Sequence, residues 1–334
     1  MLTVKKQGVI LENSGAAFES AGVLNPAVIK SDNAIHLFYR AVATGNRSTI
    51  GYCRLSDPLT VEERLDFPVI VPEFEYESQG VEDPRIVQID NLYYLTYTAY
   101  DGFNAFGALS LSSDLVHFIK KGIIAPRIGY KDFQRLVTTS GQLNRKYFRF
   151  DQSSTLMWDK NLIFFPRRIN GQLAFLHRIR PGIQIVYVDE LEALTDEFWT
   201  DYFKSFQSYI VLDPKYDHET SYLGGGCPPI ETQDGWLLIY HAVKDTLNGY
   251  IYSACAALLD LEKPEREIAR LPFPLFSPEE DYEKSGEVDN VCFPTGALLQ
   301  DDTLYIYYGA ADERIACATI AMPELMDELK KQPQ

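Results

Sequence analysis

The chain has 334 residues, of which 46% are hydrophobic, and it carries a formal net charge of −16 with a pI near 4.8. So acidic a chain lacks the basic surface that binding to nucleic acid or to an anionic membrane requires, although a local cluster of cations could still hold a small anion. The length allows a large core, and the 21 Tyr and 19 Phe favour strands.

The five cysteines lie far apart, are odd in number and form no CxxC pair. We therefore expect buried, reduced thiols and no metal site. No long apolar run follows the lysines near the N-terminus. The sequence thus predicts neither a signal peptide nor a membrane span, and by default a cytoplasmic protein.

A turn followed by a strand recurs five times along the chain. Asp-Asn, Asn-Gly, Asp-Gly and Asp-Asp turns begin each repeat, and such residues favour the positive φ that hairpins need. The strands after the turns span 35–40, 92–98, 173–178, 236–241 and 304–309. Strands before the turns are expected at 27–30, 85–89, 162–165, 229–232 and 296–299. Third strands are expected at 48–53, 106–111, 183–188, 252–257 and 315–319.

The repeats recur at intervals of roughly 60 to 80 residues, which suits a four-stranded propeller blade with a long loop. We predict an all-β fold, a single five-bladed β-propeller domain over residues 1–334 with short helical insertions. A β-sandwich with coincidental hairpins is the alternative. One acidic, amphipathic helix is expected at about 189–206. Another is expected at about 323–331, where Pro and acids precede lysines.

The residues that end the five repeated strands would converge around the axis of a propeller. They are Arg40, Thr98, Arg178, His241 and Gly309. Three of the five can carry or share positive charge, which predicts a cationic pocket for an anion such as phosphate. Two less specific interpretations stay open: Arg40 could pair with a carboxylate of the next blade, and His241 could be a hydrogen-bonded core histidine.

The segment GVEDPRIV at 80–87 places Glu82 and Asp83 beside a proline and an apolar strand. Asp83 begins the first strand of the second repeat, and Asn25 holds the matching place before a proline in the first. A carboxylate at this inner position is a candidate general acid. Asp before Pro is also ordinary turn chemistry.

These motifs resemble those of glycoside hydrolase family 130, the inverting β-mannoside phosphorylases and related β-mannosidases. The similarity follows the family's order from about residue 25 to 320. Its segments are GVEDPRI at 80–86, YLTYTA at 94–99, FPRRING at 165–171, LHR at 176–178, GGGCPPI at 224–230, GWLLIYH at 235–241, ALLDL at 257–261 and YYGAAD at 307–312. The family's five-bladed propeller agrees with the repeat.

The resemblance implies roles for the matching residues. Asp83 falls on the general acid, which in the family acts through the 3-hydroxyl of the bound mannose. Lys160, Asn161, Arg178 and His241 fall on phosphate-binding positions. Arg40, Arg47, Glu82, Tyr222 and Asp312 are expected to contact the substrate or support the site. Tyr222 is a departure, because many phosphorylases have a basic residue just before the glycine run at 224–226, and its loss favours hydrolysis.

The predicted reaction is inverting phosphorolysis of β-1,2- or β-1,4-linked manno-oligosaccharides or mannosyl-glucose to α-mannose 1-phosphate. Inorganic phosphate would be the co-substrate, with no cofactor. An inverting β-mannosidase is the alternative, and it needs a carboxylate base, for which Glu219, Glu283 and Glu287 are candidates. A non-catalytic glycan-binding propeller is a more remote alternative. The expected partners are the saccharide and phosphate, not nucleic acid or membrane, and a homo-oligomer is compatible with the sequence.

Overall fold

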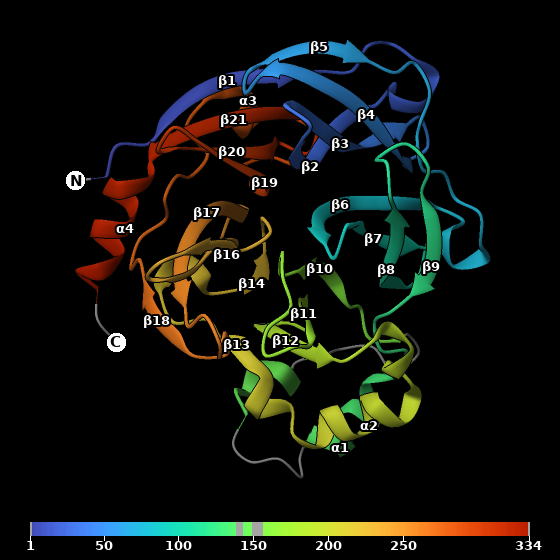
Figure 1. Cartoon of the computed structure of the whole chain (residues 1–334), viewed down its shortest axis with the longest axis vertical. Coiled ribbons are helices and arrows are strands. Elements are labelled where there is room, and N and C mark those ends of the chain that lie inside the picture. The colour runs from blue at the N-terminus through green and yellow to red at the C-terminus, as the bar shows by residue number, and fades with distance from the viewer. Residues whose placement is uncertain (1, 138–142, 149–155, 333–334) are drawn as a thin grey trace.

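The computed structural model describes residues 2–137, 143–148 and 156–332, and these are mostly β-strand, in four hydrogen-bonded sheets (Figure 1). The longest sheet contains β2 (Gly22–Ser31), β3 (Ala34–Ala43), β4 (Arg47–Asp57), β5 (Thr60–Arg64), β6 (Gly80–Ile89), β7 (Leu92–Tyr100), β8 (Ala105–Ser112) and β9 (Ile119–Ile123). β4 meets β6 through the parallel pair Ser48–Gly80, whereas the other pairings are antiparallel. This sheet therefore divides into two four-stranded antiparallel units.

Three further antiparallel units follow. The third contains β10 (Lys160–Phe164), β11 (Leu173–Arg178), β12 (Ile183–Val188) and β13 (Ile210–Leu212). The fourth contains β14 (Tyr222–Gly225), β15 (Ile230–Thr232), β16 (Gly235–Thr246), β17 (Gly249–Leu259) and β18 (Glu267–Arg270). The fifth contains β19 (Cys292–Gln300), β20 (Thr303–Ala310) and β21 (Arg314–Ala321), and β1 (Lys5–Leu11) pairs with β21. The first strand of the chain thus completes the sheet formed by the last three.

The fifteen strands expected from the five repeats are all confirmed in position. The hairpin turns have the expected left-handed backbone, with φ of 65° at Asn33, 65° at Asn91 and 60° at Asp302. The first strands of the units also lie side by side: β2 contacts β19 and β6, β6 contacts β10, and β10 contacts β14. The ends of these strands therefore meet at the centre of Figure 1.

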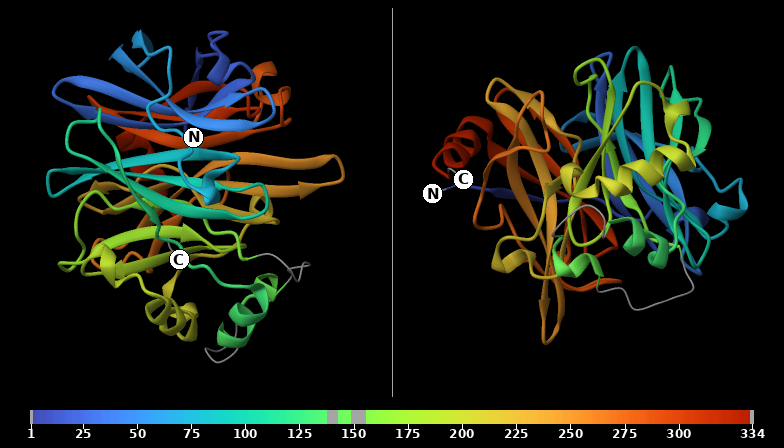
Figure 2. Two further views of the ribbon diagram at one scale, coloured as in Figure 1. Left: turned by 90° about the vertical axis from the view of Figure 1, so that its right-hand side faces the viewer. Right: turned by 90° about the horizontal axis from the view of Figure 1, so that it is seen from below.

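Four short α-helices lie outside the sheets in the described residues (Figure 2). α2 (Asp196–Lys204), preceded by a 3-10 turn at Leu191–Ala193, confirms the insertion expected near 189–206, and Thr195 caps its N-terminus. α4 (Met322–Lys330) confirms the expected C-terminal helix. α1 (Tyr130–Val137) and α3 (Asp281–Lys284) were not predicted from the sequence, and α3, with four residues, is too short to give a clear helical period. No helix of the described ranges is long and apolar enough to cross a membrane.

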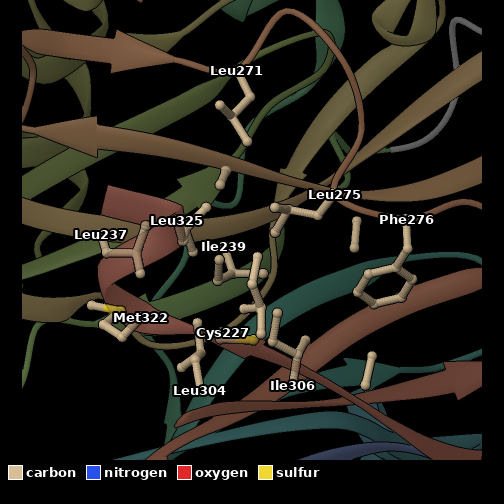
Figure 3. Close-up of a cluster of buried hydrophobic side chains, with 14 of the residues drawn as sticks. Cys227, Leu237, Ile239, Leu271, Leu275, Phe276, Leu304, Ile306, Met322 and Leu325 are labelled. Atoms are coloured by element: carbon tan, nitrogen blue, oxygen red, sulfur yellow. The ribbon is translucent and has the colours of Figure 1, made fainter. Parts of the chain in front are cut away.

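The apolar faces of neighbouring sheets pack against each other. Figure 3 shows the cluster between the fourth and fifth units, in which Leu237 and Ile239 of β16 pack with Leu304 and Ile306 of β20, and Leu325 of α4 covers them. All five cysteines are buried and unpaired, as expected. Because each unit is covered on both faces, its strands are held rigidly up to their ends.

In each of the five units, a buried carboxylate lies behind the second strand. The residue just before Arg40, Thr98, Arg178, His241 or Gly309 bonds this carboxylate at 2.6 to 2.9 Å. The pairs are Tyr39–Glu19, Tyr97–Glu77, His177–Asp159, Tyr240–Glu219 and Tyr308–Glu283. All five carboxylates have no solvent exposure. Four of them also form ion pairs, with Arg64, Lys120, Arg270 and Lys6.

These carboxylates also tie the loops to the strands. Glu219 accepts hydrogen bonds from the backbone N–H groups of Lys215 and Tyr216, at 2.6 and 3.0 Å. Glu77 and Glu283 bind the backbone of their own preceding turns in the same way. The carboxylate side chain thereby joins a loop, the second strand of its unit and a cation from a third segment. We call this arrangement the carboxylate anchor.

We expect Glu219→Ala to lower the free energy of unfolding by about 3–5 kcal/mol, because it leaves Arg270 and the Tyr240 hydroxyl buried without their common partner. Urea unfolding followed by circular dichroism measures this. Glu62→Ala is the control, because Glu62 forms an exposed ion pair with Arg54 whose loss should cost less than about 1 kcal/mol. Equal losses for the two variants would contradict the anchor.

Candidate active site

A pocket opens where the strand ends of the five units meet. It is lined by Asn25, Arg40, Asp83, Trp158, Lys160, Asn161, Arg178, Arg180, Tyr222, Tyr252, Val291, Phe293 and Asp312. Every unit contributes to this wall, so the pocket exists only when all five units are assembled. Seven of the site residues expected from the sequence belong to it, namely Arg40, Asp83, Lys160, Asn161, Arg178, Tyr222 and Asp312.

Three first strands carry an irregularity at the same place, beside the pocket. The pairing register shifts between Leu24 and Ala27, between Glu82 and Arg85, and between Lys160 and Ile163. The residues in these breaks are Asn25, Asp83 and Asn161, with φ of 51°, 52° and 58°. A β-bulge redirects a side chain, and Asn and Asp tolerate the left-handed backbone that it needs here. The equivalence of Asn25 and Asp83 expected from the sequence is confirmed.

Asp83 is held by neighbours on both sides. Its Oδ1 accepts a hydrogen bond from Asn25 Nδ2 at 2.7 Å and lies 3.5 Å from Arg40 Nη1. Arg85, fully buried, donates to the backbone carbonyls of Asp83 and Gly226, and so fixes the bulge to the glycine run of the fourth unit. Both side-chain contacts use Oδ1, which leaves Oδ2 available to a ligand.

The two carboxyl groups of the pocket have opposite electrostatic environments. Burial alone would raise the pKa of Asp83, but Arg40, Lys160, the Asn25 amide and Arg85 together hold it below its ordinary value. Burial raises the pKa of Asp312 to about 6, and the negative charge of Asp83 and Glu82 adds to the effect of burial. Asp83 is therefore ionised at neutral pH in the unliganded protein, and Asp312 titrates close to neutrality.

Glu82 joins two cations beneath the pocket. Its Oε1 accepts from Arg40 Nη2 at 2.9 Å, and its Oε2 lies 3.6 Å from Lys160 Nζ. Arg40 also donates to Ser48 Oγ at 2.9 Å. Arg40 thus pairs with carboxylates of the next unit, as one interpretation of the sequence expected, and also lines the pocket. Glu82 supports these cations rather than facing the pocket as a second catalytic group.

Two arginines on the opposite side have no carboxylate partner among the described residues. Their guanidinium carbons lie 5.1 Å (Arg178) and 3.9 Å (Arg180) from the ring centroid of Tyr222. Burial, and then repulsion from Arg180, lowers the pKa of Arg178 to about 10, so it stays charged at neutral pH. Its Nε has no hydrogen-bond partner. Two unpaired guanidinium groups side by side form an anion site.

Arg180 was missed by the sequence analysis. It follows Arg178 by two residues, and a strand direction continued beyond β11 would put both side chains on one face. Tyr252, whose hydroxyl lies 2.8 Å from that of Tyr222, and Trp158, 5.2 Å below Lys160 Nζ, were also missed. Aromatic residues are so common in this chain that no feature of the sequence singles these two out.

His241 lies behind the pocket wall and has no solvent exposure. Burial, followed by Arg178, Arg85 and Arg180, lowers its pKa far below the ordinary value. The expectation that His241 contributes positive charge is therefore wrong, although its Nε2, 3.5 Å from Arg178 Nη1, can still position that guanidinium. Gly224 makes room for the ring, because a Cβ there would lie 2.2 Å from His241 Cε1.

The two remaining expected positions, Thr98 and Gly309, are uncharged. A Cβ on Gly309 would lie 2.1 Å from Asn25 Oδ1, so only glycine allows Asn25 to reach Asp83. Thr98 is buried opposite Glu82. Arg47 is exposed at the start of β4 and is not part of the pocket wall, so its expected contact with mannose gains no support from its position.

Of the three candidate bases, two lie in carboxylate anchors. Glu219 and Glu283 have no solvent exposure and bind tyrosine hydroxyls and cations, so neither can activate a water molecule in the pocket. Glu287 is exposed and lies outside the pocket wall. Within the described ranges, no group of three or more His, Cys, Asp and Glu side chains could hold a metal ion.

Comparison with known proteins identifies the family. The sequence model of the protein family described as beta-1,4-mannooligosaccharide phosphorylase matches residues 5–331. The chain belongs to glycoside hydrolase family 130.

Curated relatives within this family are phosphorylases. The chain is 34% identical to the 1,2-beta-oligomannan phosphorylase of Thermoanaerobacter sp. strain X514, over 95% of this chain and 96% of the relative. It is 35% identical to the beta-1,2-mannobiose phosphorylase of the same organism, over 91% of both chains. The chain is thus an enzyme of the glycoside phosphorylase type. In structure it is similar to the beta-1,2-mannobiose phosphorylase of Listeria innocua, with a TM-score of 0.77, 22% identity and coverage of 99% and 100%.

The raised pKa of Asp312 gives a stability prediction for this family 130 protein. A carboxyl whose pKa rises on folding contributes stability at low pH, and this contribution is lost as the pH rises toward about 6. We expect Asp312→Asn to be more stable than the parent by about 1–2 kcal/mol at pH 8, after allowance for partial exposure, and to have no advantage at pH 4. Urea unfolding at both pH values tests this, and an advantage independent of pH would contradict it.

Proposed function

We propose that the chain is an inverting β-mannoside phosphorylase, with phosphate as the nucleophile and Asp83 as the general acid. The observation that carries the proposal is the pair of unpaired arginines, Arg178 and Arg180, across the pocket from Asp83. Phosphate is already an anionic nucleophile and needs a cationic cradle rather than a base. An inverting hydrolase needs a second carboxylate on the far face of the sugar. The anchored positions of Glu219 and Glu283 argue against that alternative.

In the proposed reaction, a terminal β-mannosyl unit lies over Asp83, with Arg40 and Asp312 beside its hydroxyls. A phosphate oxygen attacks the anomeric carbon from the side of Lys160, Asn161 and Arg178, while the bond to the bridging oxygen breaks. A proton passes from Asp83, through the 3-hydroxyl of the mannose, to the departing oxygen. The products are α-mannose 1-phosphate and an acceptor shortened by one sugar, and positioning and charge supply the rate enhancement.

The low pKa of Asp83 in the free protein is compatible with this role. A general acid must be protonated, whereas Arg40 and Lys160 favour the ionised form. A bound phosphate dianion would offset the charge of Lys160 and Arg178 and would thereby raise the pKa of Asp83. Phosphate binding would then prepare the acid for the reaction in addition to supplying the nucleophile.

Tyr222 does not remove the phosphate site. The basic residue that many phosphorylases have at this position is absent, but Arg180 lies over the Tyr222 ring at 3.9 Å and brings a positive charge to the same part of the pocket. We propose that Arg180, held by its cation–π contact with Tyr222, takes the place of the absent basic residue as a phosphate ligand.

The same proposal includes the fold, the linkage and the location. Five antiparallel units of four or five strands whose first strands adjoin, with β1 closing the last sheet, support a five-bladed β-propeller. Two curated relatives named for a β-1,2 linkage match at least 91% of the chain, so we propose β-1,2-linked manno-oligosaccharides as substrates. We propose a cytoplasmic enzyme that uses no cofactor and binds neither nucleic acid nor membranes, in keeping with its net charge of −16.

Incubation with β-1,2-mannobiose, with and without phosphate, tests the reaction. We expect α-mannose 1-phosphate only when phosphate is present, and a loss of about 10²–10⁴ in kcat for Asp83→Asn, since general acid catalysis contributes that much. β-1,4-Mannobiose serves as the linkage control. Release of free mannose at equal rates with and without phosphate would show a hydrolase instead.

The role of Arg180 gives a separate prediction. We expect Arg180→Ala to raise the KM for phosphate about tenfold or more, because a hydrogen bond to a charged group is worth about 1.5–3 kcal/mol, while the KM for the mannoside changes little. Arg266→Ala is the control, since Arg266 is an exposed residue that pairs with Asp260 outside the pocket. An unchanged phosphate KM in Arg180→Ala would exclude the residue from the cradle.

A further inference from the structure

One of the five carboxylate anchors differs from the other four. In those four, a tyrosine hydroxyl donates to the carboxylate, and an Arg or Lys side chain pairs with it. In the third unit the partner of the carboxylate Asp159 is His177, at 2.6 Å. Asp159 forms no ion pair with Arg or Lys among the described residues. Because a carboxylate without solvent exposure needs a positive partner, His177 is the group that has to supply it.

The hydrogen bonds of the His177 ring make both of its nitrogens donors. Nε2 lies 2.7 Å from the hydroxyl oxygen of Tyr202, and that hydroxyl donates its own proton to the Ile185 carbonyl at 3.1 Å. Burial, and then the charge of Asp159, raises the pKa of Tyr202 well above its ordinary value, so the hydroxyl keeps this proton. Nε2 must therefore donate to Tyr202. Nδ1 must donate as well, because an ionised Asp159 can only accept.

A histidine ring with two N–H donors is an imidazolium, which carries a positive charge. The 2.6 Å between His177 Nδ1 and Asp159 Oδ2 is short for a nitrogen–oxygen hydrogen bond, as is typical when both partners are charged. Tyr202 belongs to α2, so this helical insertion completes the bonding of the ring. His177 thus combines the hydrogen-bond donor and the cation that are separate side chains in the other four anchors.

The His177–Asp159 pair lies directly behind two cations of the proposed phosphate site. Asp159 directly precedes Lys160, the first residue of β10, and His177 directly precedes Arg178, the last residue of β11. Lys160 and Arg178 are partners in the strand register. Asp159 Oδ1 accepts a hydrogen bond from the backbone N–H of Arg178 at 3.2 Å, and the N–H of Asp159 donates to the Ala105 carbonyl at 3.1 Å. The positions of both cations therefore depend on this one pair.

The backbone between the two unpaired arginines is held by the register partner of His177. This partner is Gln184, which has no solvent exposure. Its side chain accepts from the N–H of Ile179 at 2.7 Å and donates to the carbonyl of Ile179 at 3.1 Å. Ile179 joins Arg178 to Arg180, so both guanidinium groups extend from a backbone that is bonded at two successive residues.

We propose that His177 is a buried cation that positions Arg178 and Lys160 for phosphate without touching the phosphate itself. The inference rests on the proposed phosphorylase function and adds a positioning residue to that same site. Without the charge of His177, Asp159 would be buried and unpaired, and its displacement would move the backbone of both cations. The effect should be specific to phosphate, because the residues proposed to face the mannoside belong to the first, second and fifth units.

Nitrogen NMR of the protein labelled with 15N-histidine tests the charge. We expect both ring nitrogens of His177 to carry a proton at pH 7.5, where an exposed imidazole is mostly neutral. The signal is assigned by its loss in His177→Gln and its shift in Tyr202→Phe. Asp159→Asn should remove the proton from Nδ1 alone, because the asparagine amide can donate to that nitrogen. A single ring proton on His177 in the parent protein would overturn the proposal.

Steady-state phosphorolysis tests the positioning. We expect His177→Gln to raise the KM for phosphate about tenfold, the lower end of the loss when a partner behind a metal-binding side chain is removed. The KM for the mannoside should change by less than about twofold. Tyr202→Phe removes only the acceptor of Nε2, so it is a milder variant should His177→Gln not fold, and it should raise the phosphate KM about threefold.

Tyr97→Phe is the matched control. It removes a bond of the same kind, to Glu77 in the second anchor, but the next residue, Thr98, is not part of the pocket wall. Equal effects of Tyr97→Phe and His177→Gln on the phosphate KM would overturn the positioning role, and so would equal rises in KM for phosphate and mannoside. Failure of the parent protein to form α-mannose 1-phosphate from any β-mannoside would overturn the proposed function and the positioning role with it, whereas the NMR spectrum decides the charge of His177 independently.

Discussion

The carboxylate anchor is the interaction on which the rest of the structure depends. In each unit a fully buried Glu or Asp binds a side chain of the second strand, and in two units the next residue, Arg40 or Arg178, lines the pocket. Buried charge is costly unless it is paired and fully bonded, so each anchor tolerates little displacement. The pocket is made from five units and needs such restraint, because no single unit contributes enough of the wall to keep the geometry of the pocket.

On this frame, the site separates charges of opposite sign. Asp83, Asp312 and Glu82 lie with Arg40 on one side, and Arg178 and Arg180 lie unpaired on the other. Burial, and then the charge of Arg178, Arg85 and Arg180, lowers the pKa of His241. Burial, with the charge of Asp83 and Glu82, raises the pKa of Asp312. The protein thus keeps a local excess of positive charge inside a chain of net charge −16, which is what an anionic co-substrate requires.

Much of this arrangement could be predicted because the repeat is periodic. Turn chemistry located five hairpins, and the hairpins located Arg40 and Arg178 on the second strands, where both line the pocket. The match of Asn25 with Asp83 before a proline predicted their common place, now seen as left-handed bulges. Other features lay beyond the repeat. Arg180 contributes to the pocket through Tyr222 of the next unit, Tyr252 contributes through its hydroxyl contact with the same Tyr222, and the charge of His241 depends on burial that no local pattern reveals.

The sequence by itself determined the number of repeats, the strands within them, the family and seven of the residues that line the pocket, because alternation and turn chemistry act within a few residues. Only the tertiary structure decided what those residues can do. Glu219 and Glu283 became anchors rather than bases, Arg47 came to lie outside the pocket, and Arg180 came to lie over Tyr222. The physical reason is that protonation, pairing and access depend on the distances between sheets, and those distances are fixed only when the five units pack together.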